Sequence, residues 1–199
     1  MSDNPYVLGL AFWSDWGSLR SAGNAAFSAA LYHDIYNHTE AEKFAQSQAD
    51  YILGDNSYER SFVVGWGSNP PSRPHHKNAF GRDEWFGASD TPLYSLQGAV
   101  VGGPHSNAYS DGWLDSPAGY QDIMTDYITN EVTIDYNVGL IGTLASMLVS
   151  SSSSNPSHPT NLTTAPNTTD TLVNGAFAVR GLPSFCVTQI GIMLHTLLM

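Results

Sequence analysis

The middle of the sequence, residues 54–120, is the feature that most limits what this chain can fold into. It is dense in Gly, Pro, Asn, Ser and Asp and contains few runs with a regular hydrophobic period. This composition predicts long structured loops, because Gly and Pro interrupt helices and strands. Loops of that length inside a compact domain usually carry function and are seldom plain connectors.

Helical patterns flank the loop region on both sides. An Ala-rich stretch precedes it at 21–32. Thr39 and Glu42 then match a capping box, with Thr39 as N-cap, that opens a helix ending at Gly54. After the loops, apolar residues recur at helical spacing over 132–148. Strand-type alternation is absent from the sequence, so we predict an all-α fold.

Composition divides the chain into three expected parts. Residues 1–149 form the folded domain, 150–181 a linker rich in Ser, Thr, Pro and Asn, and 182–199 an apolar tail. The tail is too short and too mixed to predict a membrane span. Membrane anchoring by the tail is therefore the less favoured alternative.

The charge balance excludes some classes of partner. The chain has 18 acidic and 7 basic side chains, a formal net charge of -11. Nucleic acid and anionic membrane surfaces attract basic patches, so we expect neither as partner. An uncharged polysaccharide fits this balance.

Features of secretion are mixed in this sequence. It contains no signal-peptide pattern, yet three glycosylation sequons occur, at Asn37, Asn161 and Asn167. We therefore expect a secreted, extracellular full-length protein. The single cysteine, Cys186, can form neither an internal disulfide nor a Cys metal cluster.

The first candidate cluster lies between Ser61 and Lys77. Paired Pro and Gly residues fix an irregular backbone there, which places His75 and His76 on a rigid loop beside Arg73. Such a loop suits hydrogen bonding to a polar ligand. The alternative is a pair of surface histidines in a turn. We expect no metal here, because adjacent side chains of extended backbone point apart.

The second candidate cluster, 120–137, interleaves carboxylates with tyrosines. Crowding and lost hydration raise the pKa of at least one carboxyl, which could then act as general acid. The alternative is a helix N-terminus whose acids favour the helix dipole. Glu131 and Asp135 would form a like-charge pair four residues apart, which costs stability on a helix. The four carboxylates are Asp122, Asp126, Glu131 and Asp135.

Together the two clusters resemble the paired signatures of glycoside hydrolase family 9. The first matches Ser-x-aliphatic-x-x-x-Gly-x-Asn, four residues, then Pro-His-His-basic. The second matches aromatic-x-Asp, four residues, aromatic, three residues, Glu, and later Asn. Supporting stretches are Trp16-Gly-Ser-Leu-Arg20, Asn24–Phe27, Asp50–Asn56 and Gly98–Pro104.

The resemblance implies the C-terminal portion of an (α/α)6 barrel whose cleft binds a β-1,4-linked glucan. Glu131 would then be the proton donor, and Asp122 the signature carboxylate that supports the site. His75 would hydrogen-bond the sugar, and Trp66 and Tyr136 would form stacking walls. Family members often carry calcium, but the sequence does not identify ligands for it.

The sequence also departs from the family pattern. That family inverts the anomeric carbon and takes its base from an Asp-Ala-Gly-Asp motif, which this sequence lacks. Lys77 stands where Arg is usual, and Val138 where a small residue is usual.

Three readings remain open. The chain is a part of an endoglucanase, a non-catalytic remnant that binds β-glucan weakly, or a self-sufficient hydrolase whose base is Asp111, Asp115 or Asp126. An incomplete barrel would expose apolar helix faces, so we also expect poor solubility or self-association.

Overall fold

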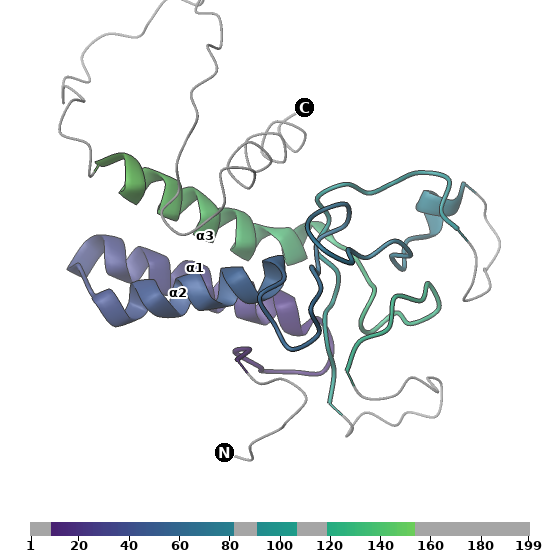
Figure 1. Ribbon diagram of the computed structural model, residues 1–199, viewed down its shortest axis with the longest axis horizontal. Coiled ribbons are helices and arrows are strands. Elements are labelled where there is room, and N and C mark those ends of the chain that lie inside the picture. The colour runs from purple at the N-terminus through teal and green to yellow at the C-terminus, as the bar shows by residue number, and fades with distance from the viewer. Residues whose placement is uncertain (1–8, 82–90, 107–118, 154–199) are drawn as a thin grey trace, which may run out of the picture. The chain divides into compact units, whose positions relative to one another are not determined.

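The computed structural model describes residues 9–81, 91–106 and 119–153. These residues contain no β-strand, only isolated backbone bridges, so the predicted all-α class is confirmed. Figure 1 shows a group of helices at one end and a group of loops at the other. The elements are α1 (Ser18–Tyr36), α2 (Thr39–Leu53), the short 3-10 helix η2 (Lys77–Phe80) and α3 (Ile134–Ser153).

The chain divides into two units, residues 1–146 and 147–199. Of the second unit, only the end of α3 is described. The rest of the predicted linker and the whole tail lie outside the described residues. Among the described helices, none combines the length and apolar character that a bilayer crossing requires.

A tight hairpin joins α1 to α2. Asn37 ends α1 in the left-handed conformation, with φ 52°. His38 then caps α2, because its ring Nδ1 accepts a hydrogen bond from the Ala41 N–H at 3.2 Å. The predicted capping box is therefore wrong: Thr39 is already the first helical residue, and an imidazole replaces the hydroxyl as the cap. Gly54 ends α2 as predicted.

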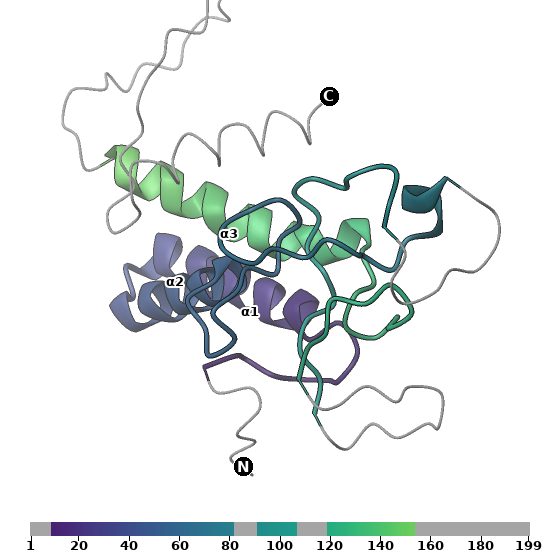
Figure 2. The same ribbon diagram turned by 45° about the vertical axis from the view of Figure 1, so that its right-hand side comes forward.

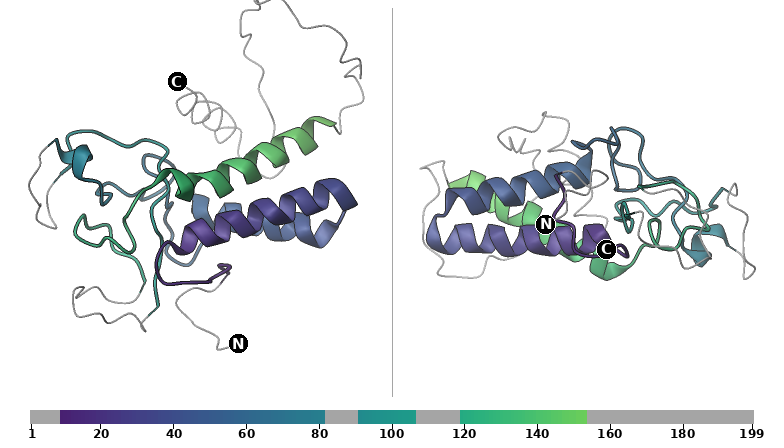
Figure 3. Two further views of the ribbon diagram at one scale, coloured as in Figure 1. Left: turned by 180° about the vertical axis from the view of Figure 1, so that it is seen from behind. Right: turned by 90° about the horizontal axis from the view of Figure 1, so that it is seen from below.

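Helices α1 and α3 lie side by side and run in the same direction (Figures 1 and 3). Gly23 meets Gly139 near their N-terminal ends, and further along the Ser146 hydroxyl donates to the Asp34 carboxylate at 2.6 Å. A methyl group added to Gly139 would lie 2.3 Å from the carbonyl carbon of Gly23. The two backbones are therefore in direct contact.

Apart from Leu19, the buried face of α1 consists of small side chains, which permits this close approach. Ala22, Ala26 and Ala30 are all at most 4% exposed. The C-terminal end of α1 carries Ile35 and Tyr36, which are 71% and 66% exposed. Exposed apolar side chains of this kind agree with the expected open helix face, and the expected self-association stays a prediction.

The loop-rich part has its own aromatic core, centred on Phe62, which is fully buried. The ring of Tyr51 stacks on it at 6.1 Å between centroids, and the rings of Tyr58 and Tyr120 meet it edge-on at 5.8 and 5.1 Å. Figure 2 brings this part of the molecule forward. The core fixes loops that have few regular backbone hydrogen bonds.

A short segment from Val100 to Pro104 links the loops to the start of α1. Its Gly102 carbonyl accepts the Leu19 N–H at 3.0 Å, which satisfies a first-turn donor of the helix. The Gly103 N–H donates to Thr129 at 2.9 Å, just before the entry to α3. This segment therefore holds the N-terminal ends of both helices at one place.

We predict that Gly139→Ala destabilises the chain by about 1–3 kcal/mol, because the added methyl group forces the two backbones apart. Urea denaturation followed by circular dichroism measures this. The control is Val138→Ala beside it, whose side chain is 52% exposed, with an expected change within about 0.5 kcal/mol. Equal effects of the two substitutions would contradict the close contact.

Candidate active site

Glu131 lies in the segment that leads into α3. Its Oε2 accepts two hydrogen bonds of 2.8 Å, one from the Trp16 indole Nε1–H and one from the Tyr136 hydroxyl. The side chain is partly exposed. The predicted helical pair of Glu131 and Asp135 is wrong, because α3 begins at Ile134 and Glu131 precedes it.

Asp135 is held by cationic and polar neighbours. The Thr133 hydroxyl donates to its carboxylate, and the Arg20 guanidinium lies 3.4 Å away. These two contacts, the hydroxyl first, lower the pKa of Asp135 below its ordinary value. Asp135 is therefore not the carboxyl that the sequence predicts to stay protonated, and Arg20 compensates its charge.

The donor Tyr136 is buried at 3% exposure. Burial raises the pKa of its hydroxyl first, and the hydrogen bond to Glu131 raises it further. Tyr136 therefore stays a donor at neutral and mildly alkaline pH. Gly17, with φ 63°, packs against this hydroxyl, and an added methyl group there would lie 2.8 Å from it. Only glycine suits both the backbone conformation and the space.

His75 is attached to the same segment by its backbone. Its N–H donates to the Asn130 carbonyl at 2.7 Å, next to Glu131. Its ring Nδ1–H donates to the Met124 carbonyl at 2.6 Å. A carbonyl only accepts, so Nδ1 carries a hydrogen and the neutral ring has a fixed tautomer. The predicted pairing of His75 and Glu131 in one site agrees with this geometry.

Two aromatic residues to which the sequence analysis assigned no role, Trp16 and Tyr127, complete the surroundings of Glu131. The Tyr127 ring lies 5.2 Å from the Trp16 ring and 6.1 Å from the His75 ring, between centroids. Trp16 is 39% exposed. The Trp16–Arg20 stretch supported the family resemblance, but spacing alone gives no sign that Trp16 lies beside a residue so far along the chain.

Asp122 organises the histidine loop through main-chain contacts. One carboxylate oxygen accepts the Ser72 N–H and hydroxyl at 2.8 and 2.7 Å, and the other accepts the Arg73 N–H at 2.9 Å. Asp122 thus fixes the backbone just before His75. This geometry is compatible with the supporting role that the resemblance implies.

A buried network supports the segment below Glu131. The Tyr120 hydroxyl donates to Asn130 at 2.6 Å, and burial raises the pKa of that hydroxyl well above its ordinary value. Asp126 is fully buried and accepts bonds from the Thr129 N–H and hydroxyl at 3.0 and 2.6 Å. A substrate therefore cannot reach the Asp126 carboxylate, which excludes Asp126 as the alternative base. Asp111 and Asp115 lie outside the described residues.

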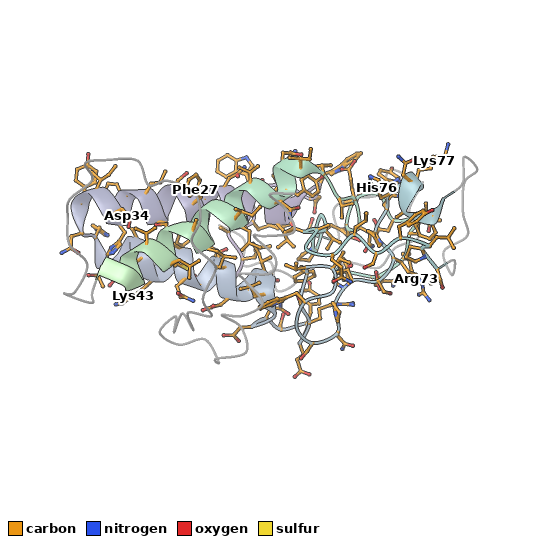
Figure 4. The ribbon with its side chains drawn as sticks, turned by 90° about the horizontal axis from the view of Figure 1, so that it is seen from above. Phe27, Asp34, Lys43, Arg73, His76 and Lys77 are labelled. Atoms are coloured by element: carbon orange, nitrogen blue, oxygen red, sulfur yellow. The ribbon has the colours of Figure 1, made fainter. Side chains whose placement is uncertain are left out.

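The other predicted binding residues lie on the loops. Figure 4 shows Arg73, His76 and Lys77 at the loop-rich end, away from Asp34 and Lys43. The described contacts of His76 and Trp66 do not join either side chain to Glu131. Their roles in substrate binding stay predictions.

A cavity of about 350 Å³ lies beside the histidine loop. Its walls include Pro70, Pro74 and the exposed Tyr94. Among the described residues, no three His, Cys, Asp or Glu side chains cluster as a metal site would require.

Comparison with known proteins agrees with the resemblance. The model of glycosyl hydrolase family 9 matches residues 4–144. Endoglucanase A of Bacillus pumilus is 42% identical over 147 residues, which cover 70% of this chain and 20% of that protein. The chain thus spans about a fifth of the length of this relative.

Solved structures show the same likeness. Endoglucanase from the termite Nasutitermes takasagoensis has a TM-score of 0.59 and 36% identity, covering 73% of this chain and 33% of that one. Endoglucanase CelQ from Clostridium thermocellum, complexed with cellotetraose, has a TM-score of 0.60 and 37% identity. The match covers 81% of this chain and 25% of the CelQ chain. The described fold is therefore part of an (α/α)6 barrel, as predicted.

We predict that Asp122→Asn destabilises the chain by about 1–3 kcal/mol, because the amide group would face N–H donors that need an acceptor. Thermal and urea unfolding measure this change. Ser72→Ala removes only one of the three bonds, so its effect should be about 1 kcal/mol or less. A larger loss in Ser72→Ala than in Asp122→Asn would contradict the assignment.

Proposed function

Since the chain belongs to glycosyl hydrolase family 9, we propose that it carries the acid side of a site that hydrolyses β-1,4-glucosidic bonds. Glu131 is the proton donor to the leaving glycosidic oxygen. A carboxyl group on a fixed segment, partly open to solvent and lined by aromatic rings, suits this task. The single observation that carries the proposal is the anchoring of Glu131 through Oε2, with no hydrogen bond to Oε1 from the residues that the structure describes.

The surroundings of Glu131 support a sugar substrate. Trp16 and Tyr127 offer ring faces and edges beside the carboxylate, and aromatic rings suit the apolar faces of pyranose sugars. His75 has one ring nitrogen committed to a backbone carbonyl, which fixes the direction of the other. CelQ, a relative of known structure, forms complexes with cellotetraose. A β-1,4-glucan is the substrate class that we assign.

The proposed reaction inverts the anomeric carbon and needs a second carboxylate. That group would activate a water on the opposite face of the sugar, about 6.5–9.5 Å from Glu131. The sequence lacks the Asp-Ala-Gly-Asp motif that supplies this base in the family. The proposal is therefore limited to the proton-donating half of the mechanism. The alternative is a chain that binds β-glucan weakly without catalysis.

The place of action and the cofactors follow from the substrate. A polymeric glucan is met outside the cell, so we propose an extracellular full-length protein. The chemistry proceeds through carboxylates and water and requires no cofactor. A calcium ion would act on structure, and its ligands are not assigned.

Azide tests the acid role in the absence of a base. Azide attacks the anomeric carbon without proton removal, the C1–O bond breaks, and the leaving oxygen takes the proton of Glu131. We predict that the chain forms glycosyl azide from a soluble β-1,4-glucan. Glu131→Gln should reduce the rate by about 10²–10⁴-fold, the usual contribution of a general acid. Mass spectrometry of the products measures both.

The matched control is Glu42→Gln, which changes an exposed glutamate on α2 and should leave the rate unchanged. Equal rates for the parent and Glu131→Gln would overturn the acid role. If no variant forms product while cellotetraose still binds, the chain is the non-catalytic glucan binder instead.

A further inference from the structure

The two hydrogen bonds to Glu131 end on the same oxygen. Trp16 Nε1–H and the Tyr136 hydroxyl both donate to Oε2, each at 2.8 Å. The indole nitrogen has a hydrogen and no lone pair to accept with, so it can only donate. A proton on Oε2 would require the Tyr136 hydroxyl to turn into an acceptor, and it would weaken the bond from the indole, which can only donate. The protonated form of Glu131 therefore carries its proton on Oε1.

The two donors are themselves held in place. The Tyr127 ring packs against Trp16 at 5.2 Å, and Gly17 packs against the Tyr136 hydroxyl. The Arg20 guanidinium lies 5.4 Å from the centre of the Tyr136 ring. An indole does not titrate, and Tyr136 keeps its proton because burial raises its pKa. Both donors thus keep their direction over the pH range in which a carboxyl changes its charge.

The same contacts assist the transfer of the proton. As the C1–O bond breaks, the proton passes from Oε1 to the leaving oxygen, and Glu131 becomes a carboxylate. Hydrogen bonds to a charged acceptor are stronger than those to a neutral one. The bonds from Trp16 and Tyr136 therefore strengthen as the reaction proceeds, which favours the transition state over the ground state.

We infer that Trp16 and Tyr136 are positioning residues that hold Oε2 of Glu131 and so assign delivery of the proton to Oε1. The inference rests on the proposed function, because it gives the direction of the acid that the function requires. Neither residue exchanges a proton with substrate. These contacts join the residues just before α1 to the entry of α3, two places far apart in the sequence.

The first test needs no activity. In the ¹⁵N-labelled full chain, the indole N–H resonance of Trp16, identified by its loss in Trp16→Phe, should move as acidification neutralises Glu131. In Glu131→Gln this movement should disappear, because the acceptor no longer changes charge. Trp13→Phe is the control, since Trp13 is 88% exposed and its loss should leave the Trp16 titration unchanged. The same movement in Glu131→Gln as in the parent would overturn the inference.

The second test separates acid positioning from folding and binding. With azide present, Trp16→Phe and Tyr136→Phe should each lower kcat about tenfold or more on a β-1,4-glucan, since misplaced groups lose rate steeply. Both should keep the parent rate on dinitrophenyl cellobioside, whose leaving group needs no proton. A loss on both substrates would indicate a merely structural role and contradict the inference.

Different results would refute the acid role of Glu131 and the positioning role of Trp16 and Tyr136. If Glu131→Gln keeps full activity, the proposed function is wrong, whatever the indole resonance does. If Glu131→Gln is inactive while Trp16→Phe and Tyr136→Phe match the parent on the glucan, the acid role stands and the positioning role is wrong. If the parent forms no product, the resonance of Trp16 alone decides the inference.

Discussion

The contact of two backbones at Gly23 and Gly139 is the constraint on which the site depends. It sets α1 and α3 side by side and in the same direction, so that both helices start at the same end. Side chains larger than hydrogen at this point would separate the helices. The start of α1 then brings Trp16, just before the helix, to Glu131 and brings Arg20 to Asp135.

The two carboxylates at this junction, Glu131 and Asp135, have different electrostatic surroundings. Arg20 and the Thr133 hydroxyl compensate Asp135, whereas the donors to Glu131 among the described residues are neutral, an indole and a phenol. A neutral donor pair can bind either form of a carboxyl group, and it binds the charged form more tightly. Neighbouring acids on one short segment can therefore serve different tasks, one in structure and one in proton transfer.

Much of the fold could be predicted from the sequence because its signals are local. The Ala-rich run and Gly54 indicated α1 and the end of α2, and the signature spacing indicated Glu131, Asp122 and His75. The cap by His38 was missed, since imidazole caps are less common than hydroxyl caps. Trp16 was missed as a site residue for another reason: its partner follows 115 residues later, and only tertiary packing joins them.

A crystal structure of this chain with cellotetraose would test the assignment of Glu131 most directly. We predict a glycosidic oxygen within about 3 Å of Oε1 of Glu131, the reach of a general acid, with Trp16 and His75 beside the sugar. Oε2 should keep its two donors. An oligosaccharide seated only in the proline-lined cavity beside Tyr94, with no sugar oxygen near Glu131, would contradict the central claim.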